Sequence, residues 1–394
     1  MLFADTIEAL TFQQRRILRE HEMDLSLWGG PTLKDLWPTD CVLSSKKDVN
    51  RAYEAVIKKI NALRSECADY TNFDSGEYKR EEISIVPDFP AAQKIMGRCP
   101  CPKEGELTRC CNLRTLDAVQ QCAYGCAYCS IQSFYSKNNI KVVGNLESYL
   151  DNLVLEEGVW HIGTGQSSDS LIFGDDYGTL TALSSFALKH PEVVIELKTK
   201  SSRSDWVSMD LPENIIATWS INAKTIVEKE EHLTSSVEKR MESAIKASEH
   251  GILVGFHVHP MVYFKGWKEE YASLVKLLTS SLDPDKVVMI GLGTLTFTKQ
   301  NLRVLREGGR KTLVTKIPLT PAAGKYSYPL ETKKEMFSYL YSLFPVEWKE
   351  KVFFYLCMED PSLWKPCLGR EYGCNKEFDS DMKRHYLYKI NEVR

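Results

Sequence analysis

Short apolar runs alternate with amphipathic helical patterns over most of the chain after residue 112. Seven of these runs read as strand candidates, at residues 115–119, 159–162, 193–197, 215–221, 252–258, 287–290 and 313–317. Between two of them, residues 237–249 place apolar side chains at helical spacing, and Gly251 follows as a helix stop. Strands that alternate with helices at this interval predict a parallel sheet, wholly or partly closed into a barrel. The predicted fold class is α/β, with a partial (β/α)6-type barrel.

The chain before this pattern is predicted to be mostly helical. Ile7, Leu10, Ile17 and Leu18 recur at helical spacing, and residues 49–63 repeat the pattern. We therefore expect three regions, listed in chain order: a mostly helical N-terminal region over 1–110, the barrel over 111–330, and a short C-terminal extension over 331–394.

Composition narrows the class of protein. Of 394 residues, 43% are hydrophobic and 26% charged, which is typical of a globular protein. No run of eighteen apolar residues is present, and the first residues lack a basic segment followed by an apolar core. We expect a cytoplasmic protein with no membrane partner. The net charge of −3 gives no broad basic surface for nucleic acid, although a local basic groove is compatible with it.

Cysteine use points to a metal. Twelve cysteines without an export signal favour a reducing compartment and metal binding over disulfides. Cys122, Cys126 and Cys129 follow the spacing C-x3-C-x2-C, with Tyr128 before the last thiol and Gly125 to let the loop curl. Three thiolates in one loop can hold an iron–sulfur cube, and they leave its fourth iron open to a small molecule. The loop follows a predicted strand, so it falls at the C-terminal face of the barrel, where chemistry collects in such folds.

The same motif resembles the signature of the radical S-adenosylmethionine (SAM) superfamily. The resemblance implies a [4Fe-4S] cluster on Cys122, Cys126 and Cys129, whose open iron binds the amino and carboxylate groups of SAM. It further implies reductive cleavage of SAM to a 5'-deoxyadenosyl radical, which abstracts hydrogen from a substrate. An electron donor such as flavodoxin or ferredoxin is then required.

A second resemblance, over about residues 110–360, is to the spore photoproduct lyase family. It is carried by seven segments that occur in the family's order, at residues 197–201, 219–222, 238–247, 251–257, 266–271, 324–326 and 354–359. This family uses the adenosyl radical to undo a methylene-bridged thymine dimer in DNA. The resemblance therefore implies a lyase-like enzyme.

Two positions depart from that family. Members carry a hydrogen-donating Cys before a Thr-Ser-Asp run, whereas this chain has Gln166 there. Members also have a Tyr directly after the last cluster Cys, where this chain has Ser130. Because an amide cannot donate a hydrogen atom as a thiol does, the chain is interpreted as a divergent member.

Several polar residues of the barrel are candidates for contact with SAM or substrate. Lys200, Ser220, Asn222 and Arg240 occupy positions where relatives contact SAM, and their side chains suit ribose hydroxyls and a carboxylate. The alternative is that they are solvated groups at strand ends. The other candidates are Tyr128 and His257 for binding the cofactor and Gln166, Ser130 and Tyr326 for catalysis. For each of them a purely structural role is the alternative. His257 and His259 share one face of a strand, either the barrel interior or the outer face.

A further group of cysteines flanks the barrel. The pool considered for a second iron–sulfur or zinc site is Cys99, Cys101, Cys110, Cys111, Cys367 and Cys374. In a closed barrel the first and last strands are neighbours, so thiols from the two groups could meet. The alternative is that they are small core residues, as buried cysteines commonly are.

The sequence thus predicts a spore photoproduct lyase-like radical SAM enzyme acting on DNA or a small molecule. Three alternatives remain open at this point. One is a DNA lesion repair lyase, the second a catalytically retired iron–sulfur or nucleic-acid-binding protein, and the third an enzyme for a small metabolite or peptide.

Overall fold

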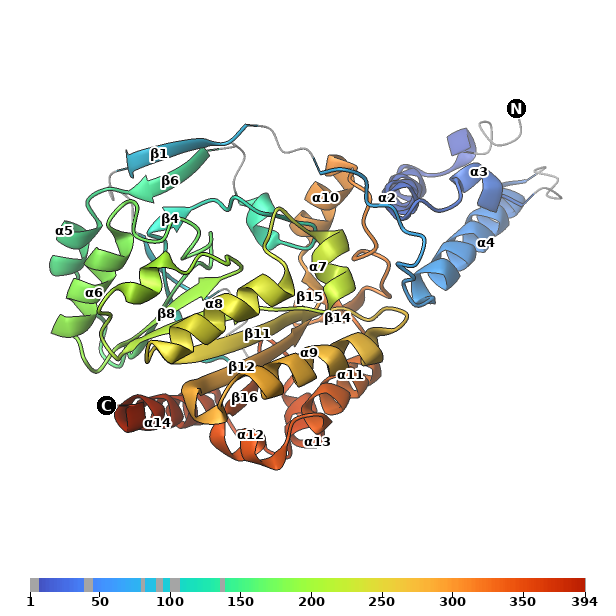
Figure 1. The fold of residues 1–394 in the computed structure, drawn as a ribbon. Coiled ribbons are helices and arrows are strands. Elements are labelled where there is room, and N and C mark those ends of the chain that lie inside the picture. Colours follow the sequence, from blue (N-terminus) through green and yellow to red (C-terminus); the bar gives the residue numbers. More distant parts are fainter. Residues whose placement is uncertain are drawn as a thin grey trace.

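A curled sheet of eight strands is the centre of the molecule (Figure 1). The computed structural model describes residues 7–38, 45–78, 82–89, 95–99, 107–134 and 139–393. In spatial order the strands are β16 (Phe353–Leu356), β12 (Val287–Thr294), β11 (Val254–Met261), β9 (Ile215–Ser220), β8 (Val194–Thr199), β7 (His161–Thr164), β3 (Arg114–Leu116) and β2 (Met96–Arg98). All neighbours are parallel except β2 and β3. The sheet is therefore an open half-barrel, which confirms the predicted fold class.

Helices cover the outer face of the sheet. α6 (Thr179–Lys189) packs on β8, and α8 (Val237–Glu249) packs on β9 and β11. α8 has the predicted bounds, because its buried Met241, Ala244 and Ala247 form one apolar stripe. The remaining helices of this half are α5 (Leu146–Asp151), α7 (Lys224–Glu230), α9 (Trp267–Ser281), α10 (Lys299–Gly308), α11 (Leu330–Ser342), α12 (Val346–Lys351), α13 (Trp364–Leu368) and α14 (Asn375–Val393).

The N-terminal region is helical and lies beside α10 (Figure 1). Its helices are α2 (Phe12–Trp28), α3 (Leu33–Leu36) and α4 (Lys46–Ser65). Buried Asp24 of α2 accepts hydrogen bonds from Arg64 of α4 and, at 2.8 and 2.9 Å, from Arg306 of α10. A carboxylate shared by two guanidinium groups fixes these three helices together. The rest of the region contributes strands, because β1 (Ser84–Phe89) and β2 lie before residue 110.

Three small sheets surround the half-barrel. β1 pairs with β6 (Asn139–Val143), which also pairs with β4 (Val119–Gln120). β13 (Thr296–Phe297), β15 (Lys325–Ser327) and β14 (Thr320–Ala322) form the second. β5 (Gly125–Cys126) and β10 (Glu231–His232) form the third, which holds the cysteine loop. Short single-turn helices complete the chain at η2 (Ser130–Ser133), η3 (Asp205–Ser208), η4 (Pro284–Lys286) and η5 (Pro361–Leu363).

One predicted strand is wrong. Residues 313–317, all buried except the half-buried Lys316, form no strand, since side chains and loop backbone take up their hydrogen-bonding groups. The amide of Leu313 donates to the Glu230 carboxylate at 2.9 Å, and the carbonyl of Thr315 accepts from Arg64 at 3.1 Å. The strand that completes the sheet is instead β16, within the predicted C-terminal extension. A short apolar run does not distinguish a buried loop from a strand.

The described helices lack the features of a membrane span. None of them combines the length and the apolar character that crossing a bilayer requires.

Candidate functional site

The cysteine loop lies beyond the C-terminal end of β3 and is pinned to β10. Cys126 is the register partner of Glu231, and the amide of Ala127 donates to the carbonyl of Glu230 at 2.7 Å. Within the loop, the amide of Cys129 donates to the carbonyl of Cys126 at 3.1 Å. The loop is therefore held in shape by backbone hydrogen bonds on both sides of its central thiol.

The three thiols of the loop share a partly desolvated environment. Cys126 is buried, and Cys122 and Cys129 are half-buried. Burial raises the pKa of Cys122 to about 12, with Asp169 and Cys129 adding to the effect. Burial likewise raises the pKa of Cys126 and of Cys129, while the Lys200 ammonium opposes the shift at all three thiols. These thiols need a cationic partner to ionise, which iron would supply when bound.

The donor set fits an iron–sulfur cluster. Three thiols from one loop, with an ammonium nearby to offset thiolate charge, match the ligand chemistry of such a cluster. Among the described residues no three Cys, His, Asp or Glu side chains converge to hold a single metal ion. A cube, however, takes each thiolate on a separate iron, so its ligands do not converge on one point.

Next to the loop, the buried carboxylate of Glu231 interacts with three polar side chains. Oε2 of Glu231 accepts from Arg240 at 2.7 Å, and its Oε1 accepts from the hydroxyl of Tyr128 and lies 3.7 Å from the Lys200 ammonium. Burial alone would raise the pKa of Glu231, but Lys200 and Arg240 lower it to about 2. Sequence reasoning named Tyr128, Lys200 and Arg240 and missed Glu231. The only signal was the acidic pair at Glu230–Glu231, which has no regular spacing to a known motif.

Arg240 is fully occupied by protein partners. Besides Glu231, its guanidinium donates to the carbonyls of Ser220 and Ser235 at 2.8 and 2.9 Å and to the hydroxyl of Thr234 at 2.7 Å. It is completely buried. In this arrangement Arg240 fixes the end of β9, where Ser220 lies, relative to the cluster loop.

Asn222 holds three elements together. Its amide nitrogen donates to the carbonyl of Pro260 at 2.8 Å, and its oxygen accepts from the Ala223 amide and, at 2.7 Å, from the hydroxyl of Tyr271. The side chain is buried, with all of its polar atoms engaged. Asn222 thus links the ends of β9 and β11 to α9.

His257 is a buried residue of β11. Its Nε2 is 2.7 Å from Glu196 of β8, whose other oxygen is 3.0 Å from Nε2 of His161, and Thr218 donates to the same carboxylate. Burial, reinforced by Lys198, lowers the pKa of His257 to about 4, so its imidazole is neutral near pH 7. Side chains from β7, β8, β9 and β11 therefore meet on one face of the sheet, with Lys198 of β8 close to His257.

The three catalytic candidates do not contact one another. Gln166 is half-buried in the turn after β7, directly after Gly165. Ser130 is exposed at the start of η2, and Tyr326 is half-buried in β15, opposite Phe297. The structure records no hydrogen bond or ring contact between any two of these three described residues.

Of the remaining cysteines, four form one thiol cluster, whereas Cys367 and the half-buried Cys374 lie elsewhere. Cys99, Cys110 and Cys357 each act electrostatically on Cys111, whose pKa is raised by burial and by those three thiols. Cys367 instead lies 3.8 Å from the carbonyl of Lys334. Cys101 lies outside the described residues. As at the cysteine loop, no three described side chains converge on a single metal ion here, and the predicted second metal site receives no support.

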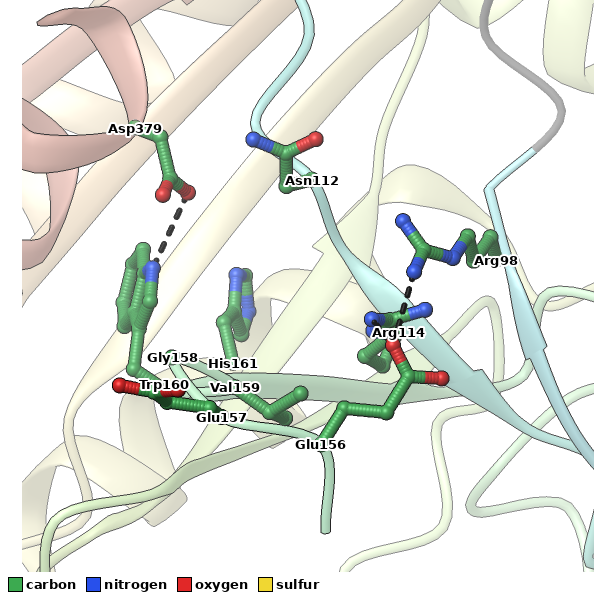
Figure 2. Close-up of a pocket in the computed structure, with 10 residues that line it drawn as sticks. All are labelled: Arg98, Asn112, Arg114, Glu156, Glu157, Gly158, Val159, Trp160, His161 and Asp379. Carbon is green, nitrogen blue, oxygen red and sulfur yellow. Dashed lines mark hydrogen bonds and ion pairs between the residues drawn. The ribbon is translucent and has the colours of Figure 1, made fainter. Parts of the chain in front are cut away.

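A polar pocket of about 320 Å³ lies at the opposite end of the sheet, where β7 begins (Figure 2). Arg98 and Arg114 both contact Glu156 there, and the indole of Trp160 donates to Asp379 at 3.0 Å. None of the predicted site residues lines it. Chemistry in barrels of this type belongs to the C-terminal ends of the strands, so this pocket is not the candidate reaction site.

Comparison with known proteins identifies relatives for this half of the chain. Residues 115–329 match the family model described as spore photoproduct lyase. Spore photoproduct lyase of Clostridium acetobutylicum is 24% identical over 220 residues, covering 54% of this chain and 64% of the relative. That of Bacillus subtilis (strain 168) is 34% identical over 96 residues, covering 24% and 28%. The chain therefore spans less than two thirds of the length of either relative.

A likeness in fold accompanies the likeness in sequence. A solved structure of spore photoproduct lyase complexed with dinucleoside spore photoproduct superposes with a TM-score of 0.53 and 22% identity. The superposition covers 62% of this chain and 76% of the solved one. At this identity the likeness supports the fold, and the site rests on the residues described above.

Proposed function

Because this chain belongs to the spore photoproduct lyase family, we propose that it is a radical SAM enzyme whose Cys122, Cys126 and Cys129 hold a [4Fe-4S] cluster. The observation that carries the proposal is the loop of three thiols, pinned to β10 beside Lys200 at the C-terminal end of the sheet. When bound, the cluster would supply the electron that cleaves SAM and so generates a radical able to abstract hydrogen. The electron would come from a donor such as flavodoxin or ferredoxin.

The chain's own residues would bind and orient SAM. Lys200 is the cation best able to reach a ligand carboxylate, because its contact with Glu231 is long at 3.7 Å, whereas Arg240 is enclosed by protein acceptors. We assign Arg240, Ser220 and Asn222 to holding the strand ends that form the SAM site. We assign His257 to the inner wall of the barrel, as a neutral imidazole whose ring is oriented by Glu196.

We further propose that the substrate differs from the thymine dimer, or that the dimer is processed poorly. Gln166 and Ser130 stand where the family's hydrogen donor and relay would be, and neither side chain donates a hydrogen atom readily. Lesion repair in DNA is the second candidate, since one similar solved structure is a complex with dinucleoside spore photoproduct.

Anaerobic reconstitution tests the cluster. The wild-type protein should hold about four irons per chain and no zinc, and its reduced spectrum should shift when SAM is added. The triple variant C122A/C126A/C129A should lose both the iron and the shift, whereas C367A should keep them. Persistence of the SAM-dependent shift in the triple variant would show that the assignment is wrong. More than four irons per chain, or bound zinc, would instead support a second metal site.

Formation of 5'-deoxyadenosine separates an active enzyme from a retired one. The reconstituted protein should convert SAM to 5'-deoxyadenosine under reducing conditions. A protein that binds the cluster but leaves SAM intact would instead be a retired iron–sulfur protein.

A further inference from the structure

Tyr78, from the N-terminal region, lies directly against Gly125 of the cysteine loop. A Cβ built on Gly125 would sit 2.4 Å from Cε1 of Tyr78, 2.6 Å from its Cζ and 2.9 Å from its hydroxyl oxygen. Such separations are far below van der Waals contact, so any side chain at 125 would collide with the ring. The φ angle of Gly125 is not positive. A left-handed backbone conformation therefore does not explain the glycine at this position. Position 125 has no room for a side chain because the Tyr78 ring fills the space.

The Tyr78 ring is itself held by two residues next to the loop. It stacks on His232 with ring centroids 5.0 Å apart and an interplanar angle of 26°. The guanidinium carbon of Arg310 lies 4.7 Å from the Tyr78 centroid, within the range of a cation–π contact. His232 is also the register partner of Gly125 in the β10–β5 pair. One ring thus contacts the cluster loop, the strand that pins it and the segment after α10.

Arg310 extends this arrangement to a cluster ligand. It lies close enough to Cys126 and to Glu230 for an electrostatic interaction with both. Its cation would offset part of the negative charge that a thiolate-bound cluster brings to the loop. Tyr78 therefore keeps a positive charge beside Cys126 while its ring covers Gly125.

We propose that Tyr78 is a positioning residue that forms the outer wall of the cluster-binding loop. This inference rests on the proposed function, that the loop binds a cluster. Tyr78 lies outside residues 115–329, which match the family model, so the wall is supplied by a part of the chain that the family assignment does not describe. With the ring in place, the Gly125–Cys126 segment is fixed and small solutes do not reach the cluster from that side.

Iron release to a chelator tests the wall without an activity assay. From anaerobically reconstituted protein, Y78A should release iron faster than wild type, on the order of tenfold, because its loop has lost a packed contact. Y78F keeps the ring and should stay close to the wild-type rate. Y388A removes an exposed tyrosine of α14 and serves as the matched control. Equal rates for Y78A and wild type would overturn the proposal.

A double-mutant cycle tests the contact itself. G125A should accelerate iron release in the wild-type and Y78F backgrounds, where the ring collides with the new methyl group, and should add little in the Y78A background. G308A is the control, because nothing lies within 4 Å of a Cβ at Gly308. If G125A has the same effect in all three backgrounds, Tyr78 does not act through Gly125.

Thermal unfolding of the cluster-free protein gives a second readout of the same cycle. G125A should lower the Tm in the wild-type background and leave it nearly unchanged in the Y78A background. This measurement remains informative if Y78A retains too little cluster for iron release to be timed. Failure of the wild-type protein to take up iron would refute the proposed function, whereas normal uptake with no coupling in either readout would refute only the role of Tyr78.

Discussion

Arg240 and Glu231 form a fully buried ion pair behind the cluster loop, with 2.7 Å between guanidinium nitrogen and carboxylate oxygen. Both residues are tied to the site, since Glu231 is the register partner of Cys126 and Arg240 donates to the carbonyl of Ser220. A buried charge is stable only while its partner is present. The pair therefore couples the shape of the loop to the end of β9.

Removing this carboxylate should destabilise the protein strongly. E231Q leaves the Arg240 charge buried and uncompensated, and we expect a loss of about 3–5 kcal/mol in the free energy of unfolding. Urea denaturation measures it. E228Q is the control, because Glu228 forms an exposed pair with Lys224 at 3.9 Å and should cost little. Similar stabilities for E231Q and E228Q would contradict a structural role for the buried pair.

Stability should fall as the pH drops from about 6.5 to about 4. His257 has a pKa near 4 in the folded state and 6.5 as its ordinary value, so the unfolded chain binds the extra proton first. The neutral His257 contributes up to about 3 kcal/mol to the free energy of unfolding. This contribution is complete above pH 6.5 and is lost progressively as the pH falls to 4. The groups acting on it are Glu196, Lys198 and Lys200.

Replacing His257 separates its contribution from that of the other imidazoles with a lowered pKa, which are His21, His232, His259 and His385. H257N should show a shallower dependence of unfolding free energy on pH between 4 and 6.5 than wild type. Parallel curves for the two proteins would mean that His257 titrates normally in the folded state.

Lys200 should determine affinity for SAM. K200M removes the cation that acts on all three thiols. It should raise the SAM concentration needed for half of the spectral shift by roughly tenfold, which is about 1.4 kcal/mol of binding free energy. K198M is the matched control, since Lys198 lies two residues earlier, within β8. An unchanged midpoint in K200M would exclude a direct role in binding SAM.

A thiol at position 166 should improve processing of the thymine lesion. Wild type should release little thymine from the dinucleoside spore photoproduct, because Gln166 cannot return a hydrogen atom. Q166C should release more, by roughly tenfold or a barrier change of about 1.4 kcal/mol, whereas Q166S should resemble wild type. Efficient, repeated turnover by wild type without by-products would show that the chain repairs the lesion through another donor.

Regular patterns made most of the fold predictable from sequence. α8 was predictable because apolar residues recur at 3.6-residue spacing and Gly251 follows as a helix stop. The central strands were predictable because both faces are covered, which leaves continuous apolar runs such as β12. Residues 313–317 carry a similar run, yet their partners are Glu230 and Arg64, and distant side chains leave no periodic trace.

The candidate site was predictable where a motif specifies chemistry and not where contacts form between distant segments. The spacing of Cys122, Cys126 and Cys129 identified the loop by itself. Glu231 was missed because its role depends on the pairing of β10 with β5, which local sequence does not specify. Tyr78 was missed for the same reason, since 47 positions separate it from Gly125 along the chain.

The positions of the two outermost strands of the half-barrel limit which fragments of the chain could fold alone. β2 and β16 both lie outside residues 115–329, so a fragment limited to that range would expose β12, all eight residues of which are buried in the whole chain. A long apolar strand with unpaired backbone groups is a template for pairing with other molecules. The family-matched segment, expressed alone, would therefore self-associate, and a useful minimal fragment must extend at least from β2 to β16.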